Sequence, residues 1–202
     1  THNYKYPLGH YITAKYWHQV DPDGIHFAIS DTGWGKALWG KLYGQWICEA
    51  PIFTYDFDDF DAKKILQMIE KYKITTFCAP PTAYRVMVHL QLEKYDLSSL
   101  QNVTTAGEAL NPKIYEKFKE KTGFDIMEGF GQTETTMLIG NIKGMTPRPG
   151  SMGKPSPLYE VAVMLSDGSI AKTGEEGEIV VKVADGVPNG LFTGYYNDKE
   201  KT

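Results

Sequence analysis

The chain has 202 residues, of which 42% are apolar, enough to bury the core of one domain or of two small ones. Its formal net charge of −4 comes without a long run of one sign, which argues against nucleic acid or an anionic membrane surface as the main partner. No apolar stretch approaches the ~20 residues that a membrane span needs, and the N-terminal residues contain no secretory signal.

The cysteines and histidines indicate neither a disulfide framework nor a metal site. Cys48 and Cys78 both lie among apolar neighbours and form no Cys-x-x-Cys motif. We therefore expect reduced core thiols in a cytoplasmic protein rather than a disulfide. The five histidines lack the close spacing of zinc ligands.

The first part of the chain predicts a helix and then a short strand. Leu8, Ile12 and Tyr16 are spaced for one helical face, with Tyr11 beside them, so we expect a helix that packs this face under the core. An Asp-Pro-Asp-Gly turn follows, because proline presets φ and glycine accepts a positive φ. The apolar residues 25–29 after it are typical of a strand.

The next segments continue this alternation. Residues 30–35 form a loop with helix-capping side chains, and a helix is expected over 36–43. The apolar run 47–55 contains Pro51 and suggests a strand that begins after a kink. Three aspartates then precede an amphipathic helix that carries Ile65, Leu66, Ile69 and Tyr72, with the acidic side chains at the positive end of the helix dipole.

Further strand–helix pairs follow up to residue 127. Strands are expected at 74–79 and 103–106, and helices from Thr82 and from the capping pair Asn111-Pro112. Strand and helix thus alternate from about residue 25 to 127, which predicts an α/β fold: a mainly parallel sheet with flanking helices.

The pattern changes near Gly144. A segment rich in proline and glycine is followed by strands at 161–165 and 178–183, with hairpin signals and no helix between them. We therefore expect two subdomains, an α/β part over residues 1–144 and a smaller all-β part over 145–202.

The stretch from Met127 to Thr136 (Met-Glu-Gly-Phe-Gly-Gln-Thr-Glu-Thr-Thr) has the chemistry of a ligand site. Its two glycines flank Phe130, so the backbone is expected to turn tightly and approach a ligand closely. The hydroxyls, the amide and one carboxylate suit phosphate oxygens and a hard cation such as Mg²⁺. Chemistry alone leaves open a polar loop that merely caps a helix.

Three other loops are weaker candidates. Gly107-Glu108-Ala109 follows a strand, where open α/β sheets bind ligands. Trp34, between two glycines, could wall a pocket or belong to the core. The aromatic residues at 193–196 are more typical of a β-subdomain edge than of a site. The glycine-rich dinucleotide motif, the P-loop and the hydrolase nucleophile elbow are absent.

The stretch Gly-Phe-Gly-Gln-Thr-Glu-Thr at 129–135 resembles the aromatic-Gly-x-Thr-Glu motif of the adenylate-forming superfamily. With Gln before Thr-Glu-Thr, it is most similar to the acyl-CoA synthetase branch, which includes acetyl-CoA and medium-chain acyl-CoA synthetases. Other stretches occur in the order of that branch, so the resemblance covers essentially the whole chain. These stretches are 30–34, 79–85, 107–110, 149–153, 177–179 and 190–195.

The resemblance implies a two-step reaction. A carboxylic acid and Mg-ATP would give an acyl-adenylate and pyrophosphate, and the CoA thiol would then displace AMP. The substrates implied are ATP, CoA and a small carboxylic acid, a medium-chain fatty acid above all, with Mg²⁺ as the metal. Catalysis would rest on positioning and on charge neutralisation at the phosphates.

The resemblance also implies roles for individual residues. Phe130 would stack on the base, Thr133 would donate to phosphate and acyl-carboxylate oxygens, and Glu134 would hold Mg²⁺. The adenine wall and the backbone beside the nucleotide would comprise Gly107, Glu108, Ala109, Glu128, Gly129, Gly131 and Gln132.

The acyl pocket would lie at Gly131 and Trp34. By the same resemblance, acetate-selective relatives have a bulky tryptophan at the place of Gly131. We therefore expect an open volume beside Gly131 that admits an acyl group longer than acetyl, with Trp34 partly refilling it. On this interpretation, Gly131→Trp in the intact enzyme would shift preference toward acetate or propionate.

The chain resembles an internal piece of the large N-terminal domain of such an enzyme. The family's phosphate loop would precede Thr1, and its catalytic lysine would follow Thr202. We therefore expect no adenylation by these residues alone. The alternatives are an aryl-CoA ligase, a peptide-synthetase adenylation domain, or a non-catalytic module that binds a nucleotide or an acyl group.

Overall fold

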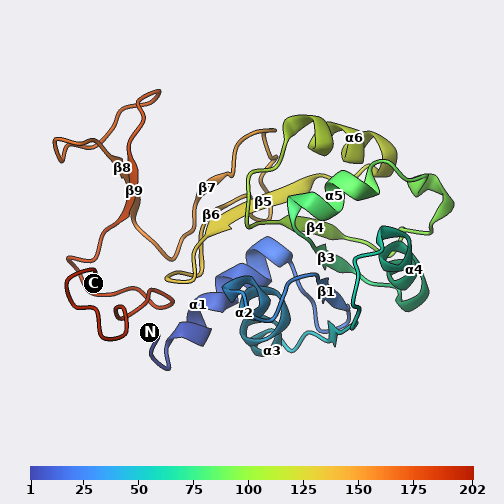
Figure 1. The fold of residues 1–202 in the computed structure, drawn as a ribbon, viewed down its shortest axis with the longest axis horizontal. Coiled ribbons are helices and arrows are strands. Elements are labelled where there is room, and N and C mark those ends of the chain that lie inside the picture. Colours follow the sequence, from blue (N-terminus) through green and yellow to red (C-terminus); the bar gives the residue numbers. More distant parts are fainter.

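The computed structural model describes residues 1–202, and its largest element is a seven-stranded sheet (Figure 1). Its strands are β1 (His26–Ala28), β2 (Ile52–Phe53), β3 (Thr76–Cys78), β4 (Asn102–Thr105), β5 (Ile126–Gly131), β6 (Met137–Gly140) and β7 (Lys154–Pro155). Their order is β2-β1-β3-β4-β5-β6-β7. The first five run parallel, and β6 and β7 run antiparallel to their neighbours. This confirms the predicted α/β class.

Helices cover both faces of the sheet (Figure 1). One layer comprises α1 (Tyr6–Ile12), the π-helical turn η1 (Thr13–His18), α2 (Gly35–Lys41) and α3 (Tyr43–Ile47). The other comprises α4 (Ala62–Tyr72), α5 (Pro81–Met87), the 3₁₀ turn η2 (Leu92–Lys94) and α6 (Pro112–Thr122). Side chains alternate along each strand, so neighbouring residues face different helix layers. Phe77 packs with α4, α5 and α6, whereas the next residue, Cys78, packs with Trp17 and Trp39 of the first layer.

Local sequence chemistry sets several helix ends. Asp61 caps α4, because its Oδ1 accepts the backbone N–H groups of Lys63 and Lys64 at 2.9 and 3.4 Å. Asn111 caps α6 in the same way through Lys113. Gly123 ends α6 with φ +79°, a conformation that glycine adopts without steric cost.

The N-terminal helix exists, but its predicted inner face is wrong. Leu8 is 55% exposed and Tyr11 40% exposed, whereas Tyr6, His10 and Trp17 are buried. The spacing of apolar residues predicted the wrong face, because this layer instead buries aromatic rings and neutral histidine rings that pack edge to face. The ring centroids of Tyr6 and His10, for example, lie 4.7 Å apart.

Two other boundaries differ from expectation. The helix expected over 36–43 breaks at Leu42, whose φ of −141° and ψ of −94° separate α2 from α3. The strand expected over 47–55 shortens to β2, because Ile47 still belongs to α3 and pairing with β1 begins after Pro51.

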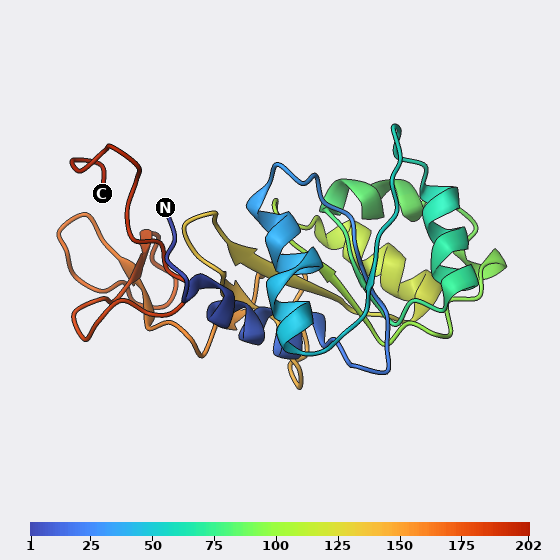
Figure 2. The same ribbon diagram turned by 90° about the horizontal axis from the view of Figure 1, so that it is seen from below.

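The C-terminal part holds a separate antiparallel pair, β8 (Val161–Met164) and β9 (Glu178–Val181). Figure 2 shows this pair beside the main sheet, with both chain termini near it. The hairpin turn at Gly168 has φ +84°, as its sequence predicts. The division at residue 144 remains a prediction, and β7 lies beyond it while pairing with β6 of the main sheet.

Cys48 and Cys78 are buried and free, as predicted. No helix in the structure combines the length and the apolar character that crossing a membrane requires.

Three buried histidines make stability depend on pH. Burial lowers the pKa of His10 and His26 to about 3, and that of His18 well below its usual 6.5. Between pH 6.5 and these folded-state values the unfolded chain binds more protons, so the free energy of unfolding falls as pH falls. It is highest above the unfolded pKa of 6.5.

We expect the free energy of unfolding to fall by on the order of 1 kcal/mol per histidine for each pH unit below about 6.5. Urea unfolding at pH 7 and at about 5.5 measures it, since few carboxylates titrate in this window. His26→Gln should reduce the dependence of the free energy of unfolding on pH by the contribution of one histidine. His89→Gln, at an exposed position, should leave this dependence unchanged. Equal stability at the two pH values would contradict the prediction.

Candidate functional site

The predicted ligand motif is mostly strand. Residues 126–131 form β5, so the expectation of a tight turn at the Gly-Phe-Gly stretch is wrong. The turn comes later, at Thr133 and Glu134, before β6. Because side chains alternate along a strand, Glu128 and Phe130 share one face of β5, and Gly129 and Gly131 share the other.

Gly129 and Gly131 are required by two indoles of the first helix layer. A Cβ placed on Gly129 would lie 2.7 Å from Trp17 Cε2, and one placed on Gly131 would lie 2.1 Å from Trp39 Cη2. Trp17 Nε1 also donates to the carbonyl of Met127 at 3.0 Å. The rings therefore pack directly on the β5 backbone.

This packing narrows the space expected beside Gly131, because Trp39 lies directly against its backbone. Gly131, Trp34 and Trp39 nevertheless line one cavity of about 330 Å³, in which Trp34 is 64% exposed. The acyl pocket at Gly131 and Trp34 therefore stays a prediction. A Gly131→Trp change would collide with Trp39 and with the Thr136 carbonyl, 2.4 Å from the added Cβ, so disrupted packing is expected before any change of substrate preference.

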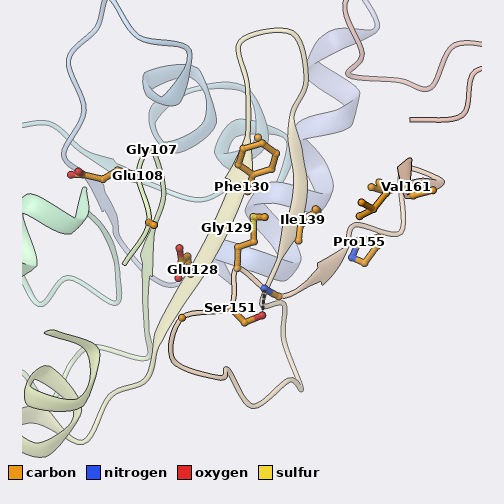
Figure 3. Close-up of a pocket in the computed structure, with 16 residues that line it drawn as sticks. Gly107, Glu108, Glu128, Gly129, Phe130, Ile139, Ser151, Pro155 and Val161 are labelled. Atoms are coloured by element: carbon orange, nitrogen blue, oxygen red, sulfur yellow. Dashed lines mark hydrogen bonds between the residues drawn. The ribbon is translucent and has the colours of Figure 1, made fainter. Parts of the chain in front are cut away.

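The other face of β5 lines a cavity of about 760 Å³ (Figure 3). Glu128 and Phe130 come from β5, and Gly107 and Glu108 come from the loop after the neighbouring β4. Gly107 has φ +108°, and a Cβ there would meet nothing within 4 Å, so its backbone conformation rather than crowding favours glycine. The remaining lining residues are Ala109, Gly129, Gly131, Ile139, Gly150, Ser151, Met152, Gly153, Pro155, Val161, Ala162 and Val163.

Glu128 is a buried carboxylate in this wall. It is 9% exposed, and its Oε1 accepts the backbone N–H of Leu110 at 3.1 Å. Burial raises the pKa of Glu128, and the Leu110 hydrogen bond opposes that rise. Glu128 therefore holds the Gly107–Leu110 loop against β5, which fixes the shape of the cavity wall.

Two further cavities meet the first at Gly107. One, of about 330 Å³, is lined by Trp34, Trp39, Gly131 and Thr133 among others. The second, of about 390 Å³, is lined by Ser30, Pro80, Thr82 and Glu108 among others. Gly107 lines all three cavities. The loop at 107–109, the motif at 127–136 and the loop at 30–35 that carries Trp34 therefore meet at this residue.

Lys36 is a residue of this region that the sequence analysis missed. It lines both smaller cavities, and its Nζ donates to the carbonyl of Ala106 at 2.9 Å. Burial lowers the pKa of Lys36, while Cys78 and Glu108 oppose that shift. The sequence did contain a signal for Lys36. A positive charge in the first turn of a helix is unfavourable next to the positive end of the helix dipole, so a lysine there suggests a functional reason for its position.

Glu134 follows the cavity-lining Thr133 but lines none of the three cavities itself. Its Oε1 accepts a hydrogen bond from Tyr195 Oη at 2.7 Å. This bond is the main cause that lowers the pKa of Glu134. The sequence analysis assigned Tyr195 to a β-subdomain edge and missed the contact.

The chain offers no cluster of three or more metal-ligating side chains. Mg²⁺ is commonly held by only one or two carboxylates together with substrate phosphates and water. The half-buried carboxylate of Glu134, next to Thr133, fits a metal ion that arrives with a nucleotide, and Glu134 is the residue that would hold it.

Comparison with known proteins matches the chain to one family and to named relatives. A family described as AMP-binding enzyme matches residues 5–196. Human acyl-coenzyme A synthetase ACSM3, mitochondrial, is 41% identical over 202 residues, and human ACSM5 is 39% identical over 197 residues. The chain spans 34% of the length of each, and the matches cover 100% and 98% of the chain.

Solved structures agree with these relatives. A Brucella canis acyl-CoA synthetase superimposes with a TM-score of 0.84 at 28% identity, covering 98% of this chain and 36% of that one. The anthranilate CoA ligase AuaEII, in complex with anthranoyl-AMP, has the same TM-score and identity, with coverage of 98% and 38%. ATP-bound MatB from Rhodopseudomonas palustris, at 20% identity, shares the fold with a TM-score of 0.87 and coverage of 100% and 39%.

The contact between Gly129 and Trp17 yields a double-mutant prediction. Gly129→Ala should destabilise the protein by about 1–3 kcal/mol, because the added methyl overpacks against the indole. Trp17→Phe removes the indole atoms nearest to it. The double variant should therefore be destabilised by less than the sum of the single variants, as measured by urea unfolding.

Gly131→Ala combined with Trp39→Phe provides the contrast. The Thr136 carbonyl, a backbone group, would remain 2.4 Å from the new Cβ, so little rescue is expected. Additive effects for Gly129 and Trp17 would show that the packing described is not what requires glycine.

Proposed function

The chain belongs to the AMP-binding enzyme family, and from this premise we propose that a protein containing it is an AMP-forming acyl-CoA synthetase. Such a protein would activate a carboxylic acid with ATP to an acyl-adenylate and then transfer the acyl group to the CoA thiol. Since the chain spans about a third of the length of its curated relatives, the activity is proposed for the larger protein.

The convergence of three cavities at Gly107 is the observation that carries this proposal. The two-step reaction brings the acid to the nucleotide and then the thiol to the acyl-adenylate, so it needs binding spaces that adjoin one another. Here the largest is walled by Phe130 and Glu128, and the two smaller ones share Trp34 and Lys36. All of them lie where β4 and β5 end, as expected of ligand sites in parallel sheets.

We assign the largest cavity to the nucleotide. Phe130 provides an aromatic face for the base, and the backbone of Gly107 to Ala109 provides polar groups beside it. Thr133 supplies a hydroxyl donor for phosphate and carboxylate oxygens where the cavity of about 330 Å³ begins. Mg²⁺ held by Glu134 would neutralise phosphate charge.

We assign the cavity of about 330 Å³ to the acyl group. Trp34 and Trp39 supply apolar walls, and a Cβ placed on Gly35 would lie 3.2 Å from Thr133 Oγ1, so the Trp34 loop abuts the motif. The volume is within the range of small-molecule sites, roughly 300–1,000 Å³. A medium-chain fatty acid is the proposed substrate, and an aromatic acid, which these two indoles would also suit, is the second candidate.

Two observations support a proposal for the compartment. Both thiols are free and buried, which suits a reducing environment. The named human relatives are mitochondrial. We propose a reducing compartment, either the cytoplasm expected from the sequence or the mitochondrial matrix.

A carboxylate panel on the full-length protein tests the function. We expect carboxylate-dependent ATP–pyrophosphate exchange, higher with medium-chain acids than with acetate, and AMP release that requires CoA. The panel should run from acetate through medium chains to benzoate. Exchange without CoA-dependent product would favour an adenylation domain instead, and absence of exchange with every acid would reject the proposal.

The isolated residues 1–202 provide a second test. We expect no carboxylate-dependent exchange from them, because the resemblance places the phosphate loop and the catalytic lysine in other segments. The full-length protein, assayed in parallel, is the control. Substantial exchange by the isolated chain would show that these 202 residues suffice.

A further inference from the structure

Glu134 is held by a segment from the far end of the chain. Tyr195 Oη donates to Glu134 Oε1 at 2.7 Å, and the backbone N–H of Phe192 donates to the Glu134 carbonyl at 2.7 Å. The rings of Phe192 and Tyr195 also contact each other, with centroids 5.0 Å apart. We call Phe192 and Tyr195 the Glu134 clamp.

The N-terminal residues support the same turn from another side. A ring nitrogen of His2, Nε2, lies 2.6 Å from the carbonyl oxygen of Thr133 and hydrogen-bonds to it. The backbone N–H of Thr193 donates to the carbonyl of Thr1 at 2.9 Å. Figures 1 and 2 both show the two terminal segments beside the β5–β6 turn. The turn is therefore fixed at both of its central residues.

The two halves of the clamp act on different parts of Glu134. The Phe192 bond fixes its backbone, and Tyr195 is the only side chain that hydrogen-bonds its carboxylate. A glutamate side chain has several rotatable bonds, so a carboxylate on it needs an outside contact to keep one orientation. One phenol hydroxyl provides that contact and leaves the second carboxylate oxygen and the negative charge available.

Carboxylates that bind metals are commonly oriented by such hydrogen bonds from a second group. We propose that Tyr195 is a positioning residue for adenylation, whose hydroxyl orients the Glu134 carboxylate toward the Mg²⁺ of bound ATP. This inference rests on the proposed function, because it takes from it the nucleotide and the metal. It adds a residue that the motif at 129–135 does not contain.

Tyr195→Phe isolates the hydroxyl. The phenylalanine ring can keep the contact with Phe192 and the position under Lys201 Nζ, which lies 4.6 Å from the ring centroid. Tyr196→Phe is the matched control, since it removes the same hydroxyl from the next residue. Tyr196 is 81% exposed and makes no side-chain hydrogen bond.

The experiment measures ATP binding to the full-length protein by calorimetry, once with excess Mg²⁺ and once with EDTA. For Tyr195→Phe we expect Mg-ATP to bind about tenfold more weakly, the lower end of what losing such an orienting group costs. Metal-free ATP should bind as it does to the parent protein, a result that general loosening of the fold would not produce. Tyr196→Phe should match the parent under both conditions.

Glu134→Gln completes a double-mutant cycle with Tyr195→Phe. It should abolish most of the Mg²⁺-dependent gain in affinity, and adding Tyr195→Phe to it should have no further effect, because the hydroxyl acts through Glu134. An Mg-ATP affinity unchanged or improved by Tyr195→Phe would overturn the inference, as would an equal loss with and without Mg²⁺. A parent protein that binds no ATP would reject the proposed function itself, and this inference with it.

Discussion

The packing of Trp17 and Trp39 on the backbone of β5 is the constraint on which the rest of the structure depends. Both indoles lie so close to the strand that Gly129 and Gly131 have no room for side chains. The contact joins the first helix layer to the sheet at the strand that carries the ligand motif. A strand held on one face in this way presents its opposite face, with Glu128 and Phe130, in a fixed position.

One strand thus serves the fold and the site on alternate residues. Met127 packs in the core with Trp17 and Trp39, and Glu128 next to it accepts the Leu110 amide and shapes the cavity. The motif resembles a ligand loop because it is rich in glycine and polar residues. Its glycines leave room for the two indoles on the far face, and the same residues also line the cavities. They thus let a bulky layer support a site that requires rigid walls.

The topology then gathers the polar groups. Parallel strands place their carboxyl ends at one edge, which brings the loop after β4 next to β5. The antiparallel return from β5 to β6 adds the turn with Thr133 and Glu134. Lys36 reaches the same edge from the first helix layer. The Lys36 ammonium and the buried Glu128 carboxylate therefore line cavities that share Gly107.

The sequence by itself determined the kind and order of most elements, the caps at Asp61 and Asn111, the mainly parallel sheet and the family motif. These depend on residues within a few positions of one another, which periodicity and capping chemistry describe. Only the tertiary structure decided which face of the first helix is buried, why Gly131 must be glycine, and that Lys36 lines the two smaller cavities and Tyr195 contacts Glu134. Those facts arise from contacts between residues far apart in the chain, such as Tyr6–Tyr43, Tyr195–Glu134 and Trp17–Met127. No local pattern encodes such pairs, since their free energy is gained only when the sheet has brought the partners together.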